Sequence, residues 1–132
     1  MLEGINHIGI AVKNLDEAVK GYAALGAKQE GEVHKAADMN AVMLAVGESK
    51  LELMEPAGGG GVIGRFLESR GEGVHHICIQ VDDIVAALAS LKAQGVRLVD
   101  EQPRQGLEGL VAFVHPKSLN GVLVELVQVP KS

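Results

Sequence analysis

Two segments of the chain repeat one another, and each repeat places a histidine near its start. Residues 6–12 read Asn-His-Ile-Gly-Ile-Ala-Val, and residues 75–81 read His-His-Ile-Cys-Ile-Gln-Val, which aligns His7 with His76. Each half of the chain also ends in an apolar run that holds one acid, Glu52 in the first and Glu125 in the second. Two imidazoles and two carboxylates suit Zn, Co, Ni, Mn or Fe, with positions left open for water or substrate. The duplication therefore predicts a metal site built from these four residues.

Each candidate ligand also has an ordinary structural explanation. A single histidine at the start of a strand is usually structural or exposed, and Glu52 alone could be a surface acid on an edge strand. Glu125 is harder to explain, because apolar residues flank it on both faces of the strand. An unpaired carboxylate there would be costly, so it must be neutral, paired or bound to a cation. The symmetric recurrence of all four residues favours the metal site.

The other histidines and the cysteine give weaker signals. His34 has no partner in the second half and is predicted to be a surface residue. His75 could support its neighbour, and a solvent-facing position is an equal alternative. Cys78 is predicted to be a small apolar filler, because nothing in the sequence lowers the pKa of its thiol.

The elements that must position these residues repeat as well. The first half predicts a strand at 4–12 and a helix with apolar residues at i, i+3, i+4 and i+7 from Leu15, capped by Asn14 and ended by Gly26. Three strands follow, near residues 28–35, 40–46 and 50–55. Within the first strand, His7 lies on the opposite face from Ile8, Ile10 and Val12, and this β-branched face is predicted to pack under the helix.

The second half repeats this β-α-β-β-β order after a glycine-rich hinge and a short helix near 62–69. A strand is predicted at 74–81, and a helix begins after its cap Asp83 and ends at Gly95. Strands are predicted near 96–100, 110–114 and 121–128. The separation between Glu52 and Glu125 is four residues longer than the separation between His7 and His76. The loop 101–109 is the expected place for that extra length. The 132 residues thus form one α+β domain, with a first module at about 1–57, a linker at about 58–73 and a second module at about 74–130.

Bulk composition excludes some functions. The net charge of −5 disfavours nucleic acid and anionic membranes as partners. The single cysteine rules out an intrachain disulfide and favours a reducing compartment, most simply the cytoplasm. The N-terminal residues lack the basic and apolar regions of a secretory signal peptide. The apolar runs of the chain are too short for a membrane span.

A few cations remain as candidates for substrate binding. His115-Pro116-Lys117-Ser118 forms a predicted turn before the last strand. Its His115 and Lys117 could touch an anionic substrate, and a solvated turn is a nearly equal alternative. The arginines are scattered and receive no assignment: Arg65, Arg70, Arg97 and Arg104.

These motifs resemble the vicinal oxygen chelate (glyoxalase-like) superfamily and, within it, the methylmalonyl-CoA epimerases. The resembling stretches span nearly the whole chain: residues 6–12, 50–56, 66–77, 115–118 and 121–126. The linker helix that leads into the double histidine, and the His-Pro-Lys turn that leads into Val-Glu-Leu, favour the epimerases over other members.

The resemblance implies two modules that form a cupped, incomplete barrel around a divalent metal ion, Co²⁺ before Zn²⁺, Ni²⁺, Mn²⁺ or Mg²⁺, usually within a homodimer. It implies epimerisation of (2R)- and (2S)-methylmalonyl-CoA through a metal-stabilised enolate. Carried over by position, the metal ligands are His7, Glu52, His76 and Glu125. Glu125 is also one acid/base, and Glu52 or a metal-bound water would be the second. Some members place a glutamate on the third strand, where this chain has Ala41, which cannot serve.

Two other functions fit parts of the pattern. A glyoxalase I (lactoylglutathione lyase) needs the same metal and the same two-sided proton transfer, so the ligands alone do not exclude it. A non-catalytic binding protein on this scaffold ranks third, because such proteins often lose ligands and all four persist here. A dioxygenase is disfavoured, since a facial triad uses one carboxylate and this set has two.

Overall fold

The computed structural model describes residues 1–131 and divides them into two compact units. One unit comprises His7–His75 and is called the His7 unit below. The other comprises Met1–Asn6 together with residues 76–131 and is called the His76 unit. The strand order along the chain confirms the predicted α+β class with two β-α-β-β-β modules.

The His7 unit contains the predicted strands and helices with small shifts at their ends. Its elements are the second half of β1 (Leu2–Ala11), then α1 (Leu15–Ala24), β2 (Lys28–Lys35), β3 (Met39–Val46), β4 (Ser49–Pro56) and α2 (Gly61–Arg70). The strands lie in the order β2-β3-β4-β1. β1 pairs with β4 in parallel, whereas the other two pairings are antiparallel.

Local signals set the limits of α1. The side chain of Asn14 accepts a hydrogen bond from the backbone N–H of Glu17 at 3.0 Å, which confirms the predicted N-cap. Gly26 follows the helix with φ of 106°, a conformation that favours glycine. The helix buries Leu15 against Ile10, Val12 and the apolar face of β3 and β4, as the β-branched pattern predicts.

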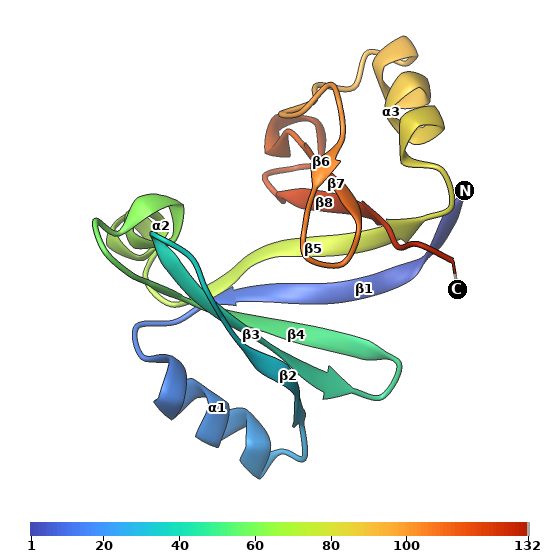
Figure 1. Cartoon of the computed structure of the whole chain (residues 1–132). Coiled ribbons are helices and arrows are strands. Elements are labelled where there is room, and N and C mark those ends of the chain that lie inside the picture. Colours follow the sequence, from blue (N-terminus) through green and yellow to red (C-terminus); the bar gives the residue numbers. More distant parts are fainter. Residues whose placement is uncertain (132) are drawn as a thin grey trace. The chain divides into compact units, whose positions relative to one another are not determined.

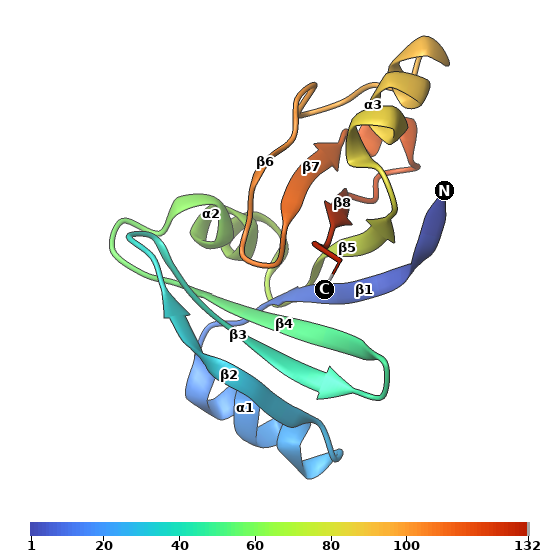
Figure 2. The ribbon, with the colours of Figure 1, turned by 45° about the vertical axis from the view of Figure 1, so that its right-hand side comes forward.

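The opposite face of the same strands is covered at one end by α2. Ala11, Ala41 and Met54 pack there against Ile63 of the helix. Figure 2 shows α1 and α2 on opposite sides of the strands β3 and β4. His7 shares the α2 face, because residues two apart on β1 point the same way.

The His76 unit is assembled in the same way around α3. Its elements are most of β5 (Gly73–Val81), then α3 (Ile84–Ala93), β6 (Arg104–Gln105), β7 (Leu110–Val114), the 3-10 turn η1 (Pro116–Ser118) and β8 (Val124–Gln128). The strands lie in the order β5-β8-β7-β6, and α3 covers one face of them (Figure 1). Asp83 accepts from the N–H of Ala86 at 3.0 Å, which confirms this cap too.

Ile79 and Val81 of β5 pack under α3 with Ile84 and Leu88, so the β-branched face again meets the helix. The other face carries His76, Cys78 and, on β8, Glu125. Both histidines therefore lie on the strand face that turns away from the first helix of their module, as predicted.

The predicted strand at 96–100 is wrong. Leu98 makes only an isolated bridge with Val114. The next two N–H groups, of Val99 and Asp100, both donate to the carbonyl of Phe113, at 3.0 and 3.2 Å. Two consecutive donors on one acceptor cannot continue a ladder, so the segment leaves the sheet. Pairing resumes only at the two-residue β6. The last strand is also shorter than predicted and begins at Val124 rather than at 121.

The extra length of the second module lies mainly in a different place from the predicted loop 101–109. Met43 stands opposite Glu52, nine positions later, and Phe113 stands opposite Glu125, twelve positions later. Three of the four additional residues therefore fall between β7 and β8, where the 3-10 turn sits. Among residues 1–131, no helix is long and apolar enough to cross a membrane.

Candidate metal and substrate site

The His7 unit brings its two candidate ligands together. Nε2 of His7 lies 3.5 Å from Oε1 of Glu52, and the two side chains are 7% and 11% exposed. The parallel pairing of β1 with β4 places Glu52 in register with Gly9, two residues beyond the histidine. The sheet therefore holds a buried imidazole beside a buried carboxylate on one face.

The His76 unit contains the same arrangement. Nε2 of His76 lies 3.3 Å from Oε1 of Glu125, and the two side chains are 4% and 13% exposed. Glu125 is in register with Cys78, again two residues beyond the histidine. The repeated register shows that the duplication seen in the sequence reproduces the His–Glu geometry and not merely the residue types.

The distances within each pair suit two ligands of one ion. Ligand atoms about 2.1 Å from a metal and separated by a tetrahedral angle lie about 3.4 Å apart. Both pairs match that spacing, at 3.5 and 3.3 Å, and both exceed a well-formed N–H···O bond of about 2.7–3.2 Å. Imidazole and carboxylate donors of this kind fit a divalent cation, and the geometry does not choose among Zn, Co, Ni and Mn.

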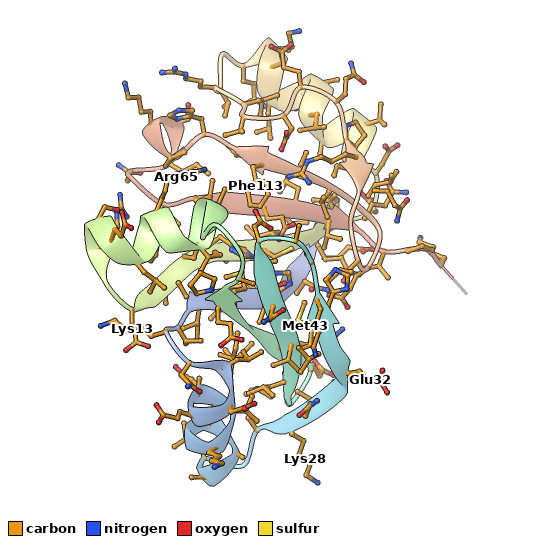
Figure 3. All side chains as sticks on the ribbon, turned by 60° about the vertical axis from the view of Figure 1, so that its left-hand side comes forward. Lys13, Lys28, Glu32, Met43, Arg65 and Phe113 are labelled. Carbon is orange, nitrogen blue, oxygen red and sulfur yellow. The ribbon has the colours of Figure 1, made fainter. Side chains whose placement is uncertain are left out.

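An aromatic ring and a cation lie beside the second pair. The ring of Phe113 (labelled in Figure 3) meets the imidazole of His76 edge-on, with centroids 5.9 Å apart. The guanidinium of Arg104 lies 5.7 Å from the centroid of the same ring. Asp100 accepts the backbone N–H of Phe113 at 2.8 Å and approaches Nε of Arg104 at 3.7 Å.

The sequence analysis missed this group, although one signal was available. Phe113 is one of only two phenylalanines in the chain. It follows a predicted loop by a few residues and precedes the His-Pro-Lys turn. The place of Arg104 over the ring depends on the pairing of β6 with β7, which no local pattern reveals.

Charged residues also extend along the face of the His7 unit that holds the first pair. Lys50 is in register with His7, and its ammonium lies 3.3 Å from Oε1 of Glu30. Glu30 stands opposite Met43, which in turn stands opposite Glu52. By contrast, Lys28 and Glu32 of the fully exposed strand β2 extend outward in Figure 3.

Ala41 occupies the position at which some relatives were expected to place a glutamate. It is 2% exposed and stands opposite Met54 under α2. A methyl group enclosed in this way neither carries nor receives a proton, in agreement with the sequence analysis.

His115 and Lys117 lie at the turn between β7 and β8, as predicted. Nδ1 of His115 accepts the backbone N–H of Lys117 at 3.0 Å, and the backbone N–H of His115 donates to the carbonyl of Arg97. Partial burial lowers the pKa of His115 below its ordinary value of 6.5, and the charges of Arg97 and Lys117 lower it further. The accepted hydrogen bond leaves the proton of the neutral ring on Nε2.

The two other histidines and the cysteine lie in three different environments. His34 is exposed on β2, as predicted. His75 is half-buried and packs edge-on against Phe66 of α2, with ring centroids 5.0 Å apart. Cys78 is fully buried with Val111 and Val127, which agrees with its predicted role as an apolar filler.

Comparison with known proteins gives a consistent result. Residues 6–113 match the model of the glyoxalase/bleomycin resistance protein/dioxygenase superfamily. The chain is 40% identical to a mitochondrial methylmalonyl-CoA epimerase of Dictyostelium discoideum, over 92% of this chain and 76% of the relative. It is 39% identical to an ethylmalonyl-CoA/methylmalonyl-CoA epimerase of Cereibacter sphaeroides, over 98% of this chain and the whole of the relative. A solved methylmalonyl-CoA epimerase in complex with methylmalonyl-CoA and NH4+ superposes with a TM-score of 0.88 at 36% identity, over 98% of this chain and 96% of that one.

Proposed function

Because the chain belongs to the glyoxalase/bleomycin resistance protein/dioxygenase superfamily and, within it, to the methylmalonyl-CoA epimerases, we propose that it is an enzyme that interconverts (2R)- and (2S)-methylmalonyl-CoA. The observation that carries the proposal is the pair of buried His–Glu contacts with identical register in the two units. These pairs supply what the reaction requires, namely ligands for a divalent cation and carboxylates that exchange protons.

The proposed metal ligands are His7, Glu52, His76 and Glu125. Their support is the donor chemistry, the low exposure and the spacing within each pair. A divalent cation, when bound, acts as a Lewis acid that makes the C2 proton of the thioester more acidic. Co²⁺ is the first ion to test, with Zn²⁺, Ni²⁺, Mn²⁺ and Mg²⁺ as alternatives.

The proposed acid/base residues are Glu125 and Glu52. Epimerisation needs one group that removes the C2 proton from one face and another that returns a proton on the opposite face. Glu125 stands opposite Phe113 and in register with the fully buried Cys78, and its side chain is only 13% exposed. This low exposure limits the water that competes with the substrate for the carboxylate.

The turn after β7 is proposed to bind the anionic parts of the substrate through His115 and Lys117. The cationic Lys117 is exposed, and the half-buried ring of His115 presents its Nε2–H as a donor. The remaining proposals are a homodimer, as the family resemblance implies, and a cytoplasmic location, which fits a single cysteine in a reducing compartment.

Solvent exchange tests the function directly. Methylmalonyl-CoA is incubated in D2O with metal-free and with Co²⁺-loaded protein, and the C2 proton is followed by NMR. We expect metal-dependent loss of that proton together with loss of stereochemical purity. Absence of exchange with both preparations would remove this substrate. Isomerisation of the glutathione hemithioacetal of methylglyoxal, measured in parallel, would then move the glyoxalase I function to first place.

A further inference from the structure

Arg104 lies on the strand face that carries the second His–Glu pair. It stands opposite Val111 in the pairing of β6 with β7. Val111 in turn packs with Cys78 and Val127, the neighbours of Glu125 on the same face. The side chain of Arg104 thus approaches the His76–Glu125 pair from the β6–β7 hairpin. This hairpin follows residues 96–100, which were predicted to form a strand.

Two ring contacts connect this cation to the metal-ligating imidazole. The guanidinium of Arg104 lies 5.7 Å from the centroid of Phe113, and that centroid lies 5.9 Å from the centroid of His76. The distance from the guanidinium to the imidazole therefore cannot exceed the sum of these two distances. A malonyl thioester whose reacting carbon lies at the His76–Glu125 pair would have its carboxylate within that distance.

The hairpin that carries Arg104 is fixed by close backbone contacts. The N–H of Gly106 donates to the carbonyl of Gly109 at 2.7 Å. A Cβ on Gly106 would meet the side chain of Val111 at 2.8 Å, and one on Gly109 would collide with the carbonyl of Gln128. The hairpin therefore lies tightly against β7 and β8, so little ordering is needed when a ligand reaches Arg104.

The described contacts of Arg104 engage only part of its guanidinium. Asp100 approaches Nε at 3.7 Å, and the guanidinium lies over the ring of Phe113. The side chain is 57% exposed, so the two terminal amino groups can be reached by a ligand. An exposed ion pair of this length contributes little to stability by itself. A contribution to folding stability therefore does not explain why Arg104 is held in this position.

The net charge of −5 makes a local cation important, because the protein as a whole repels anions. From these observations we propose that Arg104 is a substrate-binding residue that pairs through its terminal amino groups with an oxyanion of the substrate, either the free carboxylate or a CoA phosphate. The inference rests on the proposed function and extends its binding site beyond the turn that holds His115 and Lys117. Bidentate pairing is the geometry that arginine forms with both carboxylates and phosphates.

The test compares Arg104→Met and Arg104→Lys with the wild-type protein, using methylmalonyl-CoA and methylmalonyl-pantetheine as substrates. The pantetheine thioester retains the carboxylate and lacks the phosphates. Lys92→Met is the matched control, because it removes one cation from the same unit at α3, where Lys92 pairs with Glu101. Metal content and melting temperature are measured for each variant.

For Arg104→Met we expect KM for methylmalonyl-CoA to rise at least about tenfold with kcat within about threefold of wild type, the loss typical of a charged hydrogen-bonded contact. Arg104→Lys should recover part of this loss, and Lys92→Met should leave KM unchanged. An equal rise on both thioesters assigns the carboxylate, and a rise confined to the CoA thioester assigns a phosphate. A KM within twofold of wild type on both thioesters overturns the inference.

The outcome also separates this inference from the proposed function. If the wild-type protein epimerises methylmalonyl-CoA and Arg104→Met retains its KM, only the role of Arg104 fails. If the wild-type protein does not turn the substrate over, the proposed function fails. The Kd of methylmalonyl-CoA for wild type and Arg104→Met, measured by calorimetry, then tests the arginine by the same tenfold criterion.

Discussion

Replacing Glu125 with glutamine changes one atom of a nearly buried side chain and should separate proton transfer from packing. The side chain is 13% exposed, lies opposite Phe113 on β7, and is in register with Cys78 on β5. The carboxamide has the same shape and retains an oxygen that can ligate a cation. We therefore expect the Glu125→Gln protein to fold and to bind metal, with a melting temperature close to that of wild type.

The catalytic loss should be large, because an amide cannot accept the C2 proton. A positioned acid/base contributes roughly 10²- to 10⁴-fold to a rate, or about 3–5 kcal/mol at 1.36 kcal/mol for each factor of ten. Epimerisation by Glu125→Gln should fall by that factor. If two residues act on opposite faces, wash-out of the C2 proton should be lost for one epimer and retained for the other.

The assay follows the C2 proton of each purified epimer in D2O by NMR, with metal content measured on the same samples. Glu52→Gln is the matched control, because it makes the same chemical change in the His–Glu pair of the other unit. Loss of wash-out for the opposite epimer would identify Glu52 as the second acid/base. Full activity of Glu52→Gln would place that role elsewhere. A fully metallated Glu125→Gln protein that retains more than a tenth of wild-type epimerisation would refute the role of Glu125.

Three further predictions concern stability and titration. Removal of the metal by a chelator should lower the melting temperature by roughly 10 °C relative to protein with Co²⁺ at 100 times its Kd, and calorimetry showing no difference would contradict a bound ion. Leu53→Ala should reduce the free energy of unfolding by about 2–5 kcal/mol in urea titrations, because Leu53 is fully buried in the core under α1. The imidazole of His115 should titrate by NMR below pH 6.5, and Lys117→Gln should raise its pKa, since burial and the neighbouring cations disfavour the charged ring. The pKa of His115 is lower in the folded than in the unfolded protein. The stability that comes from neutral His115 is therefore present above about pH 6.5 and is lost as the pH falls through the folded pKa. An NMR titration midpoint above 6.5 would show that the ring is not shielded as described.

The predictable part of this chain is the part that the duplication constrains. The β-branched faces of β1 and β5 and the caps at Asn14 and Asp83 follow from local patterns, and the structure contains them. The two His–Glu pairs follow as well, because both halves repeat a histidine near the start of their first strand and a glutamate in their last apolar run. Period-two alternation then decides which face each histidine takes.

The parts that could not be predicted depend on which distant backbone groups meet. Residues 96–100 have the apolar composition of a strand, yet the carbonyl of Phe113 accepts two consecutive N–H groups and ends the ladder. The additional residues of the second module lie mostly after β7, because Phe113 and not an earlier residue stands opposite Glu125. The local sequence predicts neither the two hydrogen bonds to the Phe113 carbonyl nor the pairing of Phe113 with Glu125.

The two modules differ most at the positions beside their glutamates, and this difference bears on the chemistry. Met43 and Phe113 occupy equivalent places, each directly opposite the glutamate of its own unit. Of the two, only the phenylalanine offers an aromatic ring, and this ring contacts the guanidinium of Arg104 and forms a T-shaped pair with the imidazole of His76. Duplication alone would yield two identical half-sites. The aromatic ring at one of them places the Arg104 guanidinium beside the pair of the His76 unit, and this is therefore the half where we expect the anionic end of the substrate to be held.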